Sequence, residues 1–133
     1  MITINDILNL VKEKTGANNI NPETDIFSDL GCVGDDFHEL IDEYAKRFSI
    51  DMSGYLWFFH ADEEGISVGG LFFKPPYEKV KRIPITPTIL LHYANEGKWS
   101  MKYPAYKLPK RRFDLIINLI TVIVVVIWII LTC

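Results

Sequence analysis

Apolar residues recur at helical spacing in two segments near the start of the chain. The first segment predicts a helix that ends at Gly16, and its apolar positions are Ile4, Ile7, Leu8 and Val11. In the second segment, Asp35 or Asp36 is in place to cap a helix. The apolar stripe of this second helix consists of Phe37, Leu40, Ile41, Tyr44 and Phe48. Apolar residues are expected to hold the intervening 17–34 loop against the core, namely Ile20, Ile26, Phe27 and Leu30.

A third helix is predicted where Thr86 supplies an N-cap and is followed by proline, and this helix ends at Gly97. We expect Trp99 to fold back over its end. Two aromatic runs precede the helix, at residues 55–60 and 71–74. A polar, glycine-containing stretch separates the two runs, which predicts either a hairpin or an extended hydrophobic loop.

The last apolar segment, residues 113–131, is long and almost uninterrupted. As a helix it is about 28 Å long, which matches the ~30 Å hydrocarbon core of a bilayer. From residue 122 onward it is apolar on every face, whereas a surface helix of a small domain has a polar face. Asp114 lies close to basic residues, and Asn118 and Thr121 are able to bond their own helix or a neighbour. The segment therefore predicts a membrane span.

Basic residues directly precede this span and predict its orientation; they are Lys107, Lys110, Arg111 and Arg112. Because basic residues are enriched on the cytoplasmic side of a membrane, we expect the preceding domain in the cytoplasm and the protein to be tail-anchored. The cysteines fit this compartment, since Cys32 lies in the preceding domain and Cys133 at the far end of the span. A disulfide between two chains through Cys133 is the alternative.

Residues 1–100 are expected to form one small domain, followed by a proline-containing basic linker at 101–112 and a membrane anchor at 113–133. The net charge of −3 is unevenly divided: residues 1–64 carry fourteen acidic and four basic residues, whereas residues 65–112 carry ten basic and two acidic ones. The basic part is expected to lie against anionic lipid headgroups. The acidic part would be repelled by phosphates, so nucleic acid is not an expected partner.

Few residues suggest chemistry. His38 and Asp42 have the i, i+4 spacing of a metal pair or an acid and base, but the sequence places no third ligand, so we interpret them as part of a solvated helix face. His60 and His92 are expected to pack at the edge of the core. The acids at 62–64 lack the alternating ligands of a calcium loop. Without a phosphate-binding glycine loop, nucleophile elbow or paired-cysteine site, we expect no enzymatic activity, no cofactor and no metal.

Residues 25–51, DIFSDLGCVGDDFHELIDEYAKRFSID, resemble acyl carrier proteins, in which a DLG turn precedes an acidic helix. In carriers, a serine at the start of that helix bears phosphopantetheine, and Gly34 occupies its position here. The attachment hydroxyl is therefore missing. Cys32 is close by, but phosphopantetheinyl transfer uses a hydroxyl, so we assign Cys32 to packing.

A longer series of motifs is similar to the domain of unknown function 1493 family, small enterobacterial proteins that look like acyl carriers. The motifs are a GDD turn at 34–36, an aromatic segment after the second helix, a basic proline-containing stretch at 79–84, and a proline-begun helix ending in Gly-Lys-Trp at 97–99. This resemblance implies a mainly α fold: a small carrier-like helical bundle with the aromatic loop or hairpin inserted, plus one C-terminal transmembrane helix. It implies no established activity.

We therefore expect the function to lie in binding. A module anchored in the bacterial inner membrane would present its acidic helix to an unknown cytoplasmic protein, as carriers do to their enzymes. The candidate partner-binding residues are Asp35, Asp36, Glu39, Asp42 and Glu43. Two alternatives stay open: a small membrane protein that acts through its transmembrane helix, and an atypical carrier that lacks the phosphopantetheine serine.

Overall fold

The computed structural model describes residues 1–61, 69, 72, 77, 80–107 and 111–133. Its helices are α1 (Ile4–Thr15), α2 (Gly34–Arg47), the short 3-10 helix η1 (Trp57–Phe59), α3 (Pro87–Glu96) and α4 (Phe113–Thr132). The described residues form no strand, and the bridge between Asp51 and Lys98 is isolated. The prediction of a mainly helical protein with one apolar C-terminal helix is confirmed.

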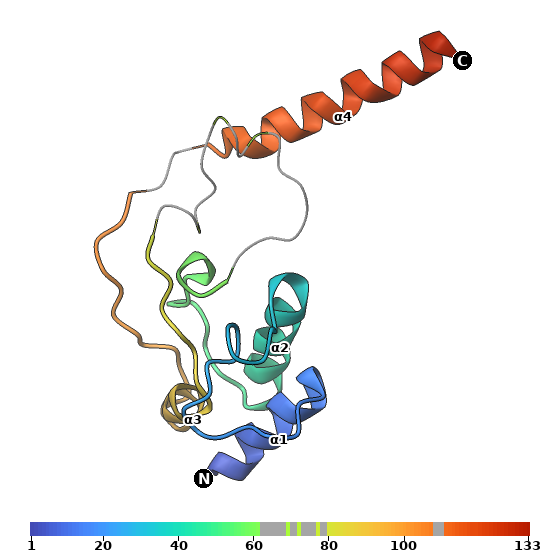
Figure 1. Cartoon of the computed structure of the whole chain (residues 1–133). Helices are drawn as coiled ribbons and strands as arrows, with labels where there is room; N and C mark the ends of the chain where they lie inside the picture. Colours follow the sequence, from blue (N-terminus) through green and yellow to red (C-terminus); the bar gives the residue numbers. More distant parts are fainter. Residues whose placement is uncertain (62–68, 70–71, 73–76, 78–79, 108–110) are drawn as a thin grey trace. The chain divides into compact units, whose positions relative to one another are not determined.

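The chain divides into two compact units. Unit 1 consists of Met1–Glu64 and Arg82–Pro104, and unit 2 of Gly65–Lys81 and Ala105–Cys133. Unit 1 contains α1, α2, η1 and α3, and within it α1 packs against both α2 and α3 (Figure 1). Unit 2 contains α4.

Helix α1 ends, and helix α3 begins and ends, where the sequence predicts. Thr3 and Asp6 form a capping box at the start of α1. The side chain of Thr86 accepts a hydrogen bond from within the first turn of α3. Gly16 and Gly97 follow the two helices with φ angles of +70° and +77°, a left-handed conformation that glycine adopts without a steric penalty.

The start of α2 differs from the prediction. Its N-cap residue is Val33, which makes no side-chain hydrogen bond to the helix, so the expectation that Asp35 or Asp36 caps α2 is wrong. Both carboxylates lie instead in the first turn, where the positive end of the helix dipole stabilises them. The first helical residue is Gly34, with a φ angle of +56°. Since side chains disfavour this conformation, glycine allows the chain to enter the helix at this point.

The core of unit 1 lies between its helices. The predicted stripe of α2 is confirmed: Phe37, Leu40, Ile41 and Tyr44 are buried, and Phe48 packs against them. The buried hydroxyl of Tyr44 donates a hydrogen bond to the carbonyl oxygen of Leu90 at 2.6 Å, which ties α2 to α3.

The core face of α1 is rotated relative to the prediction. It consists of Ile7, Leu10 and Val11, which have the i, i+3, i+4 spacing of one helix face. Leu8 is half-exposed, so its assignment to the centre of the stripe is wrong. The local pattern is ambiguous because Leu8 and Leu10 are both apolar, and contact with α2 and α3 selects between them.

The loop between α1 and α2 packs as predicted, with Ile26 buried and Ile20, Phe27 and Leu30 against the core. The segment that leads into α3 is attached to this loop by polar contacts as well. Arg82 pairs with Asp25 at 2.7 Å, and its guanidinium lies 5.0 Å from the centre of the Phe27 ring. These contacts hold the loop in position before α2, although the loop itself has no regular secondary structure.

The aromatic run at 55–60 contains the short helix η1 and no strand, so the loop interpretation is confirmed for this segment and the hairpin is not. Of the second run, at 71–74, only Phe72 is described, and it is exposed. Residues 62–64, considered above as a calcium loop, lie outside the described residues. Trp99 is buried and lies 4.6 Å from the Tyr93 ring, which confirms that it folds back over the end of α3.

In unit 2, α4 covers the predicted span, and it is long and apolar enough to cross a membrane. Asp114 is buried and pairs with Arg112 at 2.5 Å. The hydroxyl of Thr121 donates to a backbone carbonyl of its own helix at 2.8 Å. The side chain of Asn118 accepts a hydrogen bond from the backbone N–H of Gly69 at 2.7 Å. The polar groups in α4 thus bond their own helix or a neighbour, as predicted.

Candidate functional site

Four of the five candidate partner-binding residues are exposed carboxylates on α2, namely Asp35, Asp36, Glu39 and Asp42. Their orientation follows from the helix itself, because its apolar face is held in the core and its acidic positions are directed outward. None of the salt bridges between described residues involves these four. The outer face of α2 therefore carries negative charge that no basic residue in the described part of the chain pairs with.

Glu43 differs from the other four. It is half-buried and pairs with Arg47 at 3.1 Å, and the same guanidinium reaches Glu13 of α1 at 2.8 Å. The bridge joins α1 to α2 at the surface. The charge of Glu43 is thus already compensated within the chain.

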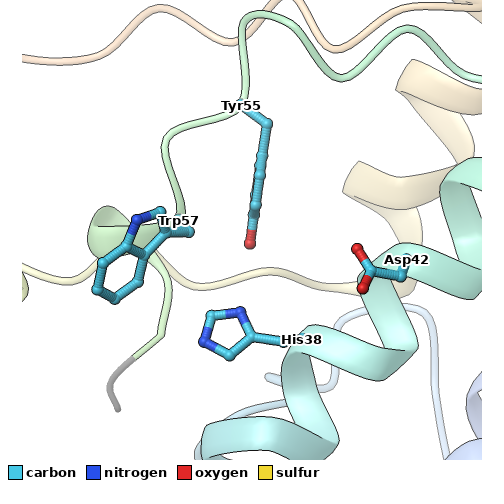
Figure 2. Close-up of a pocket in the computed structure, with 4 residues that line it drawn as sticks. All are labelled: His38, Asp42, Tyr55 and Trp57. Carbon is cyan, nitrogen blue, oxygen red and sulfur yellow. The ribbon is translucent and has the colours of Figure 1, made fainter.

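A hollow of about 320 Å³ lies beside the acidic face and is lined by His38, Asp42, Tyr55 and Trp57. Two of these side chains come from α2 and two from the segment around the start of η1 (Figure 2). The imidazole of His38 meets the indole of Trp57 edge-on, with the ring centres 5.7 Å apart. His38 is consequently half-buried, and its assignment to a solvated helix face is wrong.

Tyr55 supplies an unusual group to this hollow. Its ring stacks on the ring of His60 at 5.3 Å, nearly parallel, and meets the edge of Trp99, also at 5.3 Å. The hydroxyl is directed toward α2 (Figure 2), where its oxygen is buried and has no hydrogen-bond partner among the residues that the structure describes. Burial also raises the pKa of this hydroxyl, which keeps it protonated. A buried hydroxyl without a partner is unfavourable, and such groups are uncommon in folded proteins.

His60 has a structural role behind Tyr55. It is buried; its Nδ1 lies 2.8 Å from the carbonyl oxygen of Ile83 and its Nε2 lies 2.8 Å from the hydroxyl of Tyr103. That hydroxyl also accepts a hydrogen bond from Trp99 Nε1 at 2.8 Å. Nδ1 donates, because a carbonyl oxygen only accepts, and a neutral ring then accepts at Nε2. Burial agrees with this, since it lowers the pKa of His60 to about 4.

The other titratable candidates are not assembled into a site. His92 is exposed and pairs with Glu96 at 3.1 Å, so its predicted place at the core edge is wrong. The position follows from α3, whose buried residues include Leu90 and Ala94 on another face of the helix. The described residues hold no cluster of three metal-ligating side chains around His38 and Asp42.

The carrier-serine position is unsuited to a hydroxyl-bearing residue. Gly34 is buried and has a left-handed φ of +56°, so a serine there would be strained. Cys32 is buried and unpaired, and burial raises the pKa of its thiol to about 11. Since the thiolate is the nucleophile, this thiol is unreactive at neutral pH, which agrees with its assignment to packing.

Among the membrane-proximal basic residues, Lys107 and Arg111 are exposed, whereas Arg112 is engaged with Asp114. Lys110 lies outside the described residues. The two exposed cations are available to lipid headgroups.

A family model described as a protein of unknown function, DUF1493, matches residues 3–102 of the chain. The chain belongs to the DUF1493 family. The matched part contains α1, α2, η1 and α3, and it ends before α4. No curated protein and no solved structure matches the chain.

The motifs that resemble the DUF1493 family have clear structural roles. Gly34 and Gly97 adopt left-handed conformations at the start of α2 and after α3, and Trp99 closes the end of α3. The hollow, by contrast, is not evident from these motifs. His38 and Asp42 are visible in the sequence as an i, i+4 pair, but Tyr55 and Trp57 appear there only as members of an aromatic run.

Proposed function

We propose that this DUF1493 protein is a membrane-anchored, non-catalytic interaction module that presents α2 to a cytoplasmic partner with a basic surface. The observation that carries the proposal is the outward face of α2, where Asp35, Asp36, Glu39 and Asp42 are exposed and form no salt bridge with another described residue. Like charges on adjacent turns repel each other. A basic partner would relieve this repulsion, and it would be attracted from a distance.

The resemblance to acyl carriers supports the docking surface rather than a cargo. An acidic helix behind a DLG turn is the part of a carrier that faces its enzymes, and this chain keeps it. At the attachment position, however, Gly34 has a left-handed backbone and offers no hydroxyl. We therefore propose a carrier-like module that has kept the docking helix without phosphopantetheine.

For the membrane, we propose that α4 is a tail anchor in the bacterial inner membrane, with unit 1 in the cytoplasm. The apolar surface of α4 supports insertion, and the exposed Lys107 and Arg111 support this orientation through the positive-inside bias. The full chain should then sediment with membranes and require detergent for extraction. Recovery of the full chain in the soluble fraction without detergent would contradict the anchor.

A second candidate function is favoured by α4 itself. From residue 122 onward α4 is apolar on every face, and its first half carries Asn118 and Thr121, whose polar groups are of the kind that contact another transmembrane helix. A protein that acts through α4 would tolerate charge changes on α2 but would not tolerate a foreign anchor.

The experiment that separates the two uses affinity capture of the full chain from detergent-solubilised membranes, with quantitative mass spectrometry. In one variant, Glu39→Lys and Asp42→Lys reverse the middle of the acidic face. The matched control reverses two exposed acids elsewhere in unit 1, Glu23→Lys and Glu96→Lys, with the same change in net charge. In a third variant, an unrelated single-pass anchor replaces α4.

We expect the partner to be lost from the first variant and retained in the control and in the foreign-anchor variant. If the first variant keeps the partner and the foreign anchor loses it, the protein acts through α4. Equal losses in the first variant and in its control would mean that net charge, and not the face of α2, determines binding.

A further inference from the structure

The hollow beside α2 combines three features in a small volume. Trp57 supplies an aromatic wall, Asp42 an exposed carboxylate at the rim, and Tyr55 a hydroxyl oxygen without a partner. Its volume of about 320 Å³ is near the lower limit of ligand pockets, and is thus large enough for one long side chain and too small for a large cofactor. The hollow adjoins the acidic face, because Asp42 belongs to both.

The electrostatics of the hollow select a cation. Asp42 lies one turn from Glu39, and neither has a basic partner in the described salt bridges. The basic residues closest to this surface, Lys14 and Lys46, line a neighbouring hollow of about 220 Å³ together with Glu39, Asp42 and Glu43. An anion would be repelled by the carboxylates. A purely apolar ligand would leave the Tyr55 hydroxyl and the Asp42 carboxylate without partners.

We propose that the His38–Asp42–Tyr55–Trp57 hollow binds the guanidinium group of an arginine side chain from the protein partner of α2. A guanidinium is planar, stacks on an aromatic face and carries five N–H donors in a fixed arrangement. It would lie against Trp57, pair with Asp42 and donate a hydrogen bond to the oxygen of Tyr55. This inference rests on the proposed docking function and names the group that the partner contributes.

Two details of the structure suit this occupant. The Tyr55 ring is held between His60 and Trp99, so its hydroxyl is positioned before the ligand arrives. The oxygen is covered in the empty hollow, but His38 is only half-buried, and side-chain rearrangements of this size are common at interfaces. An ammonium group would use Asp42 equally well, yet it is more strongly hydrated and lacks a planar face for Trp57.

The test uses N-acetyl-arginine amide as the probe and N-acetyl-citrulline amide as the matched neutral control. Citrulline has nearly the same shape without the charge. Each is titrated into the full chain in lipid nanodiscs, and the side-chain NMR signals of Trp57, His38 and Tyr55 are followed. The lysine analogue is titrated in parallel, and we expect it to bind more weakly than the arginine analogue.

Variants assign the effect to the hollow. Asp42→Asn and Tyr55→Phe should each weaken arginine binding by about tenfold, as expected for the loss of a hydrogen bond to a charged group. Glu39→Gln removes an adjacent surface charge that does not line this hollow, and it should change the affinity less than about threefold by general screening alone. Citrulline binding as strong as arginine binding, or equal losses in Asp42→Asn and Glu39→Gln, would overturn the proposal.

A failure of the arginine-site proposal is distinguishable from a failure of the docking function. If Asp42→Asn and Tyr55→Phe bind arginine as the wild type does while the α2 charge reversal still abolishes capture, the hollow is not the arginine site and the docking face stands. If arginine binds in the hollow but partner capture is insensitive to the α2 reversal, the docking function fails and the hollow recognises guanidinium groups in another context.

Discussion

The same substitution, tyrosine to phenylalanine, is expected to have different effects on stability at two positions in unit 1. Tyr103→Phe and Tyr55→Phe each remove one hydroxyl and leave the aromatic ring in place. The Tyr103 hydroxyl accepts a hydrogen bond from Trp99 and donates one to His60, both at 2.8 Å. The Tyr55 hydroxyl has no hydrogen-bond partner. The comparison therefore isolates the network of hydrogen bonds from the packing of the rings.

The magnitudes follow from burial. Trp99 is 2 % exposed and His60 is 1 % exposed, so water cannot replace the lost hydroxyl at either group. Leaving a buried polar group unsatisfied costs about 1–3 kcal/mol, so the loss of a partner at both groups makes the expected cost of Tyr103→Phe about 2–6 kcal/mol. This is a large part of the stability of a small domain, about 5–15 kcal/mol. Tyr55→Phe removes an unsatisfied group and should change the free energy of unfolding by less than about 0.5 kcal/mol, or increase it slightly.

The assay is urea unfolding of the full chain in detergent micelles, followed by near-ultraviolet circular dichroism of the aromatic residues. Helical signals are avoided because α4 is expected to stay helical in the micelle. We expect a lower midpoint for Tyr103→Phe with an unchanged slope, and a midpoint for Tyr55→Phe close to that of the wild type. Equal midpoints for the two variants would refute the hydrogen-bond assignments around His60.

Three further predictions concern the core, the pH dependence and the missing attachment site. Leu40→Ala should lower the free energy of unfolding by about 2–5 kcal/mol because Leu40 is fully buried. Leu8→Ala, at a half-exposed position, should lower it clearly less. Similar losses in the two variants would mean that the core faces of the helices are misassigned. Burial lowers the pKa of His60 from 6.5 to about 4, so between pH 6.5 and 4 the unfolded state takes up this proton and the folded state does not. Stability should therefore fall by up to about 3 kcal/mol as the pH drops from 6.5 to 4, and the same fall in a His60 variant that still folds would contradict the assignment. Intact-mass measurements after coexpression with an active phosphopantetheinyl transferase should show no added phosphopantetheine on the wild type or on Gly34→Ser. The left-handed backbone at this position should make the serine variant less stable by about 1–2 kcal/mol. A modified wild type would establish that the protein is a carrier.

The sequence predicts the helices well because their signals are local. Thr3, Thr86, Gly16 and Gly97 mark the ends of α1 and α3 through capping chemistry that depends on a few neighbouring residues. The span of α4 is predicted for a similar reason, since its length and composition are sufficient.

The hollow is different, because it is made by contacts between residues far apart in the chain. Tyr55 and Trp57 reach α2 only after the aromatic segment has folded around His60, which depends on Tyr103 more than 40 residues later. No local sequence pattern predicts contacts between residues that are this far apart in the chain. The same explanation applies to the start of α2, where the conformation of Gly34 and not a capping side chain decides the boundary.

The central claim, that the acidic face of α2 contacts a protein partner, is tested most directly by photo-cross-linking in living bacteria. A photoreactive amino acid replaces Glu39 on α2, Asn9 on the exposed side of α1, or Val124 on α4 in three versions of the full chain. The account predicts one discrete adduct from position 39, none from position 9, and loss of that adduct when Asp42→Lys is added. A partner adduct from position 124 with none from position 39 would contradict it.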